Sequence, residues 1–238
     1  MIPRVNYEYS SNIPEDATFW MPSEDEIPDD EGIGNFRDVW MILNEPESEV
    51  QSVVAEEEKL IEVLDQIADS PQNYELIAEA IDSQDADVLT EGPLKSAFLQ
   101  LTEGLLQESE DYPSSLRGLE VGVAGLSYAL SMIGAVPVAS CRGHVGDYAW
   151  SESPVVFAAL DQQRVEWLQP FMREAHCGFH ISPSREEFIA IDAPSIKDSS
   201  RLAHLILENF QNRPRIFNKW LDLSLIDAIH EESFEGEG

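Results

Sequence analysis

The clearest periodic pattern lies between residues 49 and 67, where apolar residues recur at steps of three and four. This spacing gathers them on one face and predicts an amphipathic helix with a row of acidic residues on the opposite face. A shorter helix is predicted over 72–81. A third is predicted to begin near Pro93, because proline suits the first turn of a helix. These patterns predict a helical region over 49–112.

Two short apolar runs, 135–139 and 155–160, predict buried strands. The preceding residues 113–133 predict a central helix with Gly118, Gly122 and Gly125 on one face. After the second strand, the sequence predicts a helix over 161–176, a hairpin with strands at 179–182 and 187–192, a helix ending near 210 and a last helix over 216–229. The order helix–strand–strand–helix–strand–strand–helix predicts an α+β fold, with a small, mostly antiparallel sheet and helices packed on it.

Charge divides the chain into regions. Its 238 residues carry a formal net charge of −32, and residues 1–112 hold 29 acids against 4 bases, a net charge of −25. Residues 113–238 hold 17 acids against 10 bases, a net charge of −7. We therefore predict four parts: an extended acidic arm over 1–48, an acidic helical region over 49–112, the α+β domain over 113–230 and an acidic tail over 231–238.

The predicted arm carries aromatic residues, among them Trp20 and Trp40, between its acidic positions. Two interpretations fit this pattern. The rings pack onto the chain's own domain, or they are binding residues that anchor a partner, as aromatic side chains do at interface hot spots.

The negative charge also narrows the classes of partner. It repels nucleic-acid phosphate, so direct DNA or RNA binding is not expected, whereas a basic protein partner is. An ordinary acidic protein without such a partner is the plainer interpretation. The apolar run 119–138 contains Glu120 and Pro137, so we expect a buried helix and strand there and no membrane association. With two cysteines and no secretory signal pattern, the expected location is the cytoplasm.

The loop after the first strand holds the candidate chemistry: Cys141, Arg142 and His144. One interpretation is catalytic, with Arg142 and His144 lowering the pKa of a nucleophilic Cys141 thiol. A second is a zinc site, because both cysteines occur as Cys-x-x-His, and Cys141, His144, Cys177 and His180 offer a tetrahedral ligand set. A third is structural or recognition-based, with Cys141 buried as a small hydrophobic residue and Arg142 and His144 binding loop carbonyls or an anionic ligand.

Residues 139–144, Ala-Ser-Cys-Arg-Gly-His, resemble the Ser-Ser-Cys-Ser-Gly-Arg motif of a family of tRNA-modifying methyltransferases. Ala139 replaces the first serine and His144 the closing arginine. The resemblance covers about six residues, and the negative charge opposes a tRNA substrate, so no activity is inferred from it. The sequence shows no glycine-rich phosphate loop, zincin pair or nucleophile elbow, which disfavours common NTPase, protease and esterase classes.

These observations lead to two functional expectations. The first is a non-enzymatic acidic binding or regulatory protein that engages a basic partner, including a nucleic-acid-binding protein that it neutralises, and that needs no cofactor. The alternative is a zinc- or thiol-dependent enzyme or metalloprotein centred on Cys141 and His144 with Cys177 and His180.

Overall fold

A four-stranded antiparallel sheet lies at the centre of the computed structural model, which describes residues 1–22, 42, 45–106, 116–144, 151–181 and 188–214. The strands are β1 (Val136–Cys141), β2 (Val155–Ala159), β3 (Gly178–Ile181) and β4 (Ile189–Asp192). Their order is β1-β2-β4-β3, and every neighbouring pair is antiparallel. The predicted α+β fold with a small antiparallel sheet is confirmed.

The described residues also form six α-helices: α1 (Glu47–Ile67), α2 (Pro71–Asp82), α3 (Pro93–Leu101), α4 (Ala124–Met132), α5 (Gln162–Glu174) and α6 (Ile196–Asn209). Two single 3₁₀ turns, Ala86–Val88 and Phe210–Asn212, complete the described elements. Side-chain caps explain several starts, because Ser70, Asp161 and Ser195 each accept a hydrogen bond from the backbone N–H three residues later. The predicted helix over 216–229 and the tail over 231–238 lie outside the described residues.

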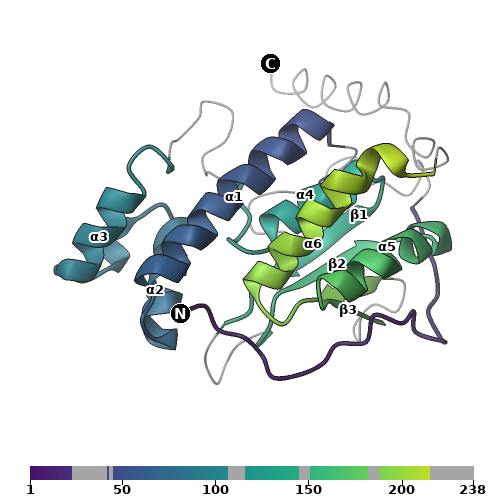
Figure 1. Cartoon of the computed structure of the whole chain (residues 1–238), viewed down its shortest axis with the longest axis horizontal. Helices are drawn as coiled ribbons and strands as arrows, with labels where there is room; N and C mark the ends of the chain where they lie inside the picture. Colours follow the sequence, from purple (N-terminus) through teal and green to yellow (C-terminus); the bar gives the residue numbers. More distant parts are fainter. Residues whose placement is uncertain (23–41, 43–44, 107–115, 145–150, 182–187, 215–238) are drawn as a thin grey trace, which may run out of the picture.

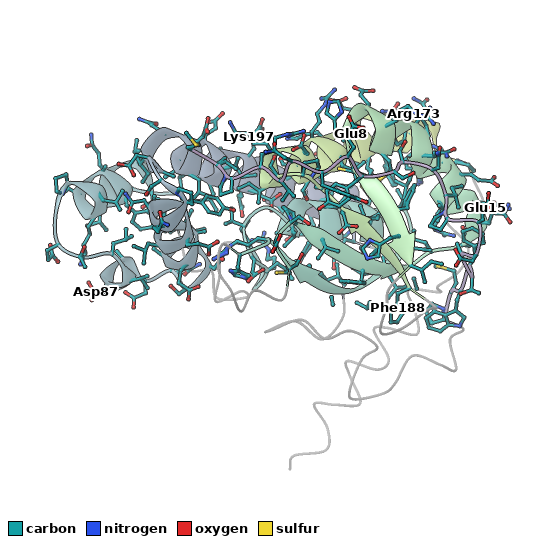
Figure 2. All side chains as sticks on the ribbon, turned by 90° about the horizontal axis from the view of Figure 1, so that it is seen from below. Glu8, Glu15, Asp87, Arg173, Phe188 and Lys197 are labelled. Carbon is teal, nitrogen blue, oxygen red and sulfur yellow. The ribbon has the colours of Figure 1, made fainter. Side chains whose placement is uncertain are left out.

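Helices α1, α4, α5 and α6 lie on one side of the sheet (Figure 1). α1 packs on α4 and α6, while α2 and α3 extend away from the sheet at one end. Figure 2 shows the two sides, with Lys197 of α6 above the sheet and Phe188 below it. One hydrophobic cluster extends from Ile42, before α1, to Phe210, after α6, and includes Val156 and Ile191 of the sheet. Residues from the predicted helical region and from the predicted α+β domain therefore share a single core.

The described part of the arm, residues 1–22, runs along β3 and α6. The N–H of Phe179 donates to the carbonyl of Ser10 over 2.9 Å, and Arg4 forms an ion pair with Asp198. Trp20 is half-buried, and its ring meets Phe188 edge-on with 5.8 Å between centroids. Trp20 thus packs on the chain's own domain, whereas Trp40 lies outside the described residues.

The central helix begins later than its sequence pattern predicts. α4 starts at Ala124, while Gly118 and Gly122 adopt left-handed φ angles of +81° and +97° in the preceding turns. A Cβ at Gly122 would also overlap the side chain of Ile196. The prediction that three glycines share one helical face is therefore wrong, because two of them allow turns that a residue with a side chain adopts at a cost.

Glu57 of α1 determines where α4 begins. Its side chain is completely buried, and its carboxylate accepts hydrogen bonds from the N–H groups of Gly122 (2.8 Å), Ala124 (2.9 Å) and Gly125 (3.1 Å). Backbone N–H groups at the start of a helix have no acceptor within it, so the carboxylate of Glu57, from another helix, accepts their hydrogen bonds. Burial raises the pKa of Glu57 to about 7, although the three N–H donors act to lower it.

None of the helices in the described part of the chain combines the length and the apolar character that a membrane span requires.

The raised pKa of Glu57 predicts a pH-dependent stability. Between the unfolded pKa of 4.5 and the folded value of about 7, the native state binds more protons than the unfolded state. The ionisation of Glu57 therefore lowers the free energy of unfolding as pH rises through this window. Glu57→Gln should flatten this dependence by up to about 1.4 kcal/mol per pH unit, measured by urea unfolding at pH 5, 6, 7 and 8.

Glu62→Gln is the matched control, because Glu62 is an exposed acid on the same helix. A slope that changes equally in both variants would contradict a specific role for the buried carboxylate.

Candidate functional site

The candidate loop follows the last residue of β1. Cys141 ends the strand, and Gly143 turns the chain with a φ of +78°. A Cβ at Gly143 would lie 2.6–2.8 Å from the backbone of Ser153, so no larger residue fits without movement of that segment. The turn brings His144 back beside Arg142, whose Nη1 lies 2.8 Å from His144 Nδ1.

Arg142 is buried and bound by carboxylates. Its Nε donates to Asp82 Oδ2 over 3.1 Å, and its Nη1 donates to Glu75 Oε2 over 3.2 Å. Both acids belong to α2, so the guanidinium joins this helix to the end of β1. Arg142 was predicted as a binding residue, and the structure places its charged group in these internal ion pairs.

Asp82 has a second role at the same place. Its Oδ1 accepts a hydrogen bond from the N–H of Val121 over 2.8 Å. Burial raises the pKa of Asp82 to about 7, while Arg142 and the Val121 N–H act to lower it. The side chain of Asp82 is only 6% exposed, whereas Asp85 and Asp87, which follow the helix, are exposed.

Next to this ion-pair cluster, three residues hold metal-binding atoms close together. The ligand atoms of Glu120, Cys141 and His144 all lie within 4.8 Å of one another. Glu120 Oε1 lies 3.3 Å from His144 Nε2. The other oxygen of Glu120 accepts a hydrogen bond from the N–H of Arg142 over 2.8 Å. The structure therefore brings Cys141 and His144 together, with a glutamate as the third member.

The environment of Cys141 disfavours a thiolate. The side chain is buried, and burial is the main reason why its pKa rises to about 11, with the charge of Glu120 adding to the effect. The N–H of Gly143 donates to Sγ over 3.4 Å, which only partly opposes this shift. A thiol with such a pKa is protonated at neutral pH, so the site lacks the activation that a nucleophilic cysteine needs.

The second Cys-x-x-His pair lies elsewhere. In the sheet, Cys141 pairs with Val155, Val155 with Asp192, and Asp192 with Gly178. Three strand spacings therefore separate β1 from β3, about 14 Å in all. Two thiolates on one zinc ion lie about 4 Å apart, so the two pairs do not share a metal in this arrangement.

Each member of that second pair has local partners. Cys177 is buried, and its thiol donates to the carbonyl groups of Ala175 and Asp198. Burial raises the pKa of Cys177 well above its usual value. His180 Nδ1 pairs with Asp192.

Sequence reasoning missed the three acids of the site, Glu75, Asp82 and Glu120. Glu120 had a visible signal, because it is the one acid in the apolar run 119–138. An acid inside such a run is expected to have a specific partner. Glu75 and Asp82 carry no comparable signal, since acids are common throughout the helical region.

A concave surface, separate from this cluster, lies between α1 and α6. It is lined by Glu58, Ile61, Glu62, Asp65, Gln66, Lys197, Ser200, Arg201, His204 and Glu208. Carboxylates outnumber lysines and arginines among these residues by four to two.

Comparison of the chain with protein-family models, curated proteins and solved structures finds no match.

The buried ion pair of Asp82 and Arg142 is expected to stabilise the protein. Asp82→Asn leaves the buried guanidinium with less compensating charge and should lower the free energy of unfolding by about 3 kcal/mol at pH 8, measured by urea unfolding. The loss should be larger at pH 5.5, because the native carboxyl group, with its pKa raised to about 7, then holds a proton that the unfolded chain has released, and this stabilises the wild type but not the variant. Asp85→Asn is the control, because Asp85 is exposed and asparagine keeps its hydrogen bond to the N–H of Asp87. Equal losses in the two variants would contradict the buried ion pair.

Burial of both cysteines predicts low thiol reactivity. In the native protein at pH 7, Cys141 and Cys177 should react with a disulfide reagent at least about 100-fold more slowly than the unfolded chain does. Both should react completely in concentrated urea. The absorbance of the released thiol measures both rates, and fast labelling of Cys141 in the native state would contradict the buried thiol.

Proposed function

We propose that the protein is a non-enzymatic binding or regulatory protein that engages a lysine- and arginine-rich segment of a partner along the α1–α6 groove. The observation that carries this proposal is the acidic lining of the groove on two packed helices. A cationic segment in the groove would add opposite charges to a surface where acids are in excess.

The charges within the groove are only partly compensated. Lys197 pairs with Asp65 over 2.7 Å, while Arg201 pairs with Glu174, which is outside the groove lining. Glu62 and Glu208 have no ion-pair partner among the described residues. These two carboxylates are therefore available to an incoming cationic group.

The mostly polar groove lining favours recognition by charge. A net charge of −32 also attracts a basic partner from a distance and speeds the encounter. Partners of this chemistry include nucleic-acid-binding proteins, whose basic surface the groove would cover and so neutralise.

A metal- or thiol-dependent protein is the second candidate. The convergence of Glu120, Cys141 and His144 favours the metal-dependent form, with zinc as the cofactor suited to sulfur and imidazole ligands. The high pKa of the Cys141 thiol disfavours the purely thiol-dependent form.

A salt series with a fluorescent oligolysine peptide tests the docking proposal. The triple variant Glu58→Gln, Glu62→Gln, Asp65→Asn should bind the peptide at least about 10-fold more weakly at low salt, measured by fluorescence anisotropy. For the wild-type protein, affinity should fall steeply as salt screens the charges.

The triple variant Asp69→Asn, Glu79→Gln, Glu103→Gln is the matched control, because it removes the same charge from exposed positions outside the groove. This control should keep most of the affinity. Equal weakening in both triple variants would mean that the peptide responds to overall charge, and the groove would lose its assigned role. Binding that is insensitive to salt would contradict the electrostatic mechanism.

A further inference from the structure

We propose that Glu120, Cys141 and His144 form a zinc site with three protein ligands and a fourth position for water. This inference develops the metal-dependent candidate and is independent of docking in the α1–α6 groove. It replaces the four-residue set Cys141, His144, Cys177 and His180, whose two halves lie about 14 Å apart across the sheet.

The separation of the ligand atoms fits the ion. Two ligand atoms that are each about 2.0–2.1 Å from a tetrahedral zinc ion lie about 3.3 Å from each other. Glu120 Oε1 and His144 Nε2 are 3.3 Å apart. Zinc–sulfur bonds are longer, and the third atom, Cys141 Sγ, lies within 4.8 Å of the other two. A side-chain shift of about 1 Å brings the sulfur to the roughly 3.6 Å that a shared zinc ion requires.

Each ligand is also oriented by a second contact. Glu120 uses its other oxygen to accept the N–H of Arg142. His144 Nδ1 lies 3.3 Å from Glu75 Oε2, which leaves Nε2 directed at Glu120. Cys141 Sγ accepts the N–H of Gly143. Metal sites in proteins commonly use this arrangement. Outer hydrogen bonds orient the ligands, and a ligand histidine lies between the ion and a carboxylate.

The charge of the cluster favours a divalent cation. Glu75 and Asp82 pair with the guanidinium of Arg142, and Glu120 accepts the backbone N–H of the same residue, so acids exceed bases by two when all are ionised. Sulfur and imidazole ligands select zinc over calcium or magnesium, which prefer oxygen ligands alone.

Zinc binding requires defined proton movements. Without metal, His144 Nδ1 accepts a hydrogen bond from Arg142 Nη1, and its Nε2–H faces Glu120. To bind zinc, Nε2 gives up its proton while Nδ1 gains one and turns to Glu75, so the ring stays neutral. Cys141 loses its thiol proton to solvent and binds as the thiolate. Binding therefore releases about one proton per zinc ion to solvent at pH 7.

Cobalt substitution tests the site in the full-length chain. Chelator-treated protein titrated with Co²⁺ should show thiolate-to-cobalt charge-transfer absorption that saturates at one equivalent and disappears when Zn²⁺ is added. Cys141→Ala should abolish this absorption, and Cys177→Ala, the matched control, should keep it. A band that is absent in the wild type, or that survives in Cys141→Ala, would overturn the proposal.

Two further variants keep the test decisive if Cys141→Ala fails to fold, which circular dichroism will show. His144→Gln should weaken zinc binding at least about 100-fold, and Glu75→Gln about 10–100-fold. Glu79→Gln, which changes an exposed acid on the same helix as Glu75, should bind as the wild type does. Wild-type affinity in His144→Gln would overturn the site, and wild-type affinity in Glu75→Gln would overturn its orienting role.

Oligolysine binding by the metal-free protein separates this inference from the docking proposal. The peptide should bind Cys141→Ala and the wild type equally. Failure of the cobalt experiment would therefore leave docking intact, and failure of docking would leave the zinc site intact.

Discussion

Two buried carboxylates hold the segment that leads into α4, and the arrangement of the candidate site depends on them. Glu57 of α1 accepts three backbone N–H groups between Gly122 and Gly125, and Asp82 of α2 accepts the N–H of Val121. Buried backbone donors are costly when they have no partner, so these acids offset a penalty that would otherwise oppose this turn. Because they belong to the first two helices, they also fix those helices to the rest of the core. Glu120, which immediately precedes the segment they hold, is thereby placed beside His144.

The need to pair buried donors also explains why some acids lie in the interior of this chain. Asp82 binds Val121 with one oxygen and Arg142 with the other. Arg142 in turn contacts Glu75 and His144, so one buried guanidinium connects α2 to the end of β1. Removing Asp82 or Glu75 leaves the buried guanidinium of Arg142 with less compensating charge, which is why we expect the cluster to act as a unit. Most of the other acids in the described part of the chain are exposed, and four of them, Glu58, Glu62, Asp65 and Glu208, give the α1–α6 groove its charge.

Much of the fold could be predicted, because it follows from local patterns. Correct predictions came from the apolar stripe of α1, the proline at the start of α3 and the short apolar runs of β1 and β2. The start of α4 was the main error. Gly118 and Gly122 look helical by spacing, but the turn there depends on Glu57 and Ile196, which are far away in the sequence.

For the candidate site, the sequence alone determined which residue types were present and where the loop would fall. It placed Cys141 and His144 after a strand, and it showed Glu120 as an isolated acid in an apolar run. Only the tertiary structure decided which groups meet: Arg142 is 60 residues from Asp82 and 67 from Glu75 in sequence. It also decided that Cys177 lies across the sheet from Cys141, since strand order separates β1 from β3. The physical reason is that the spacing of apolar residues shows only which side of a helix or strand is buried. The contacts between elements depend on how the whole core packs.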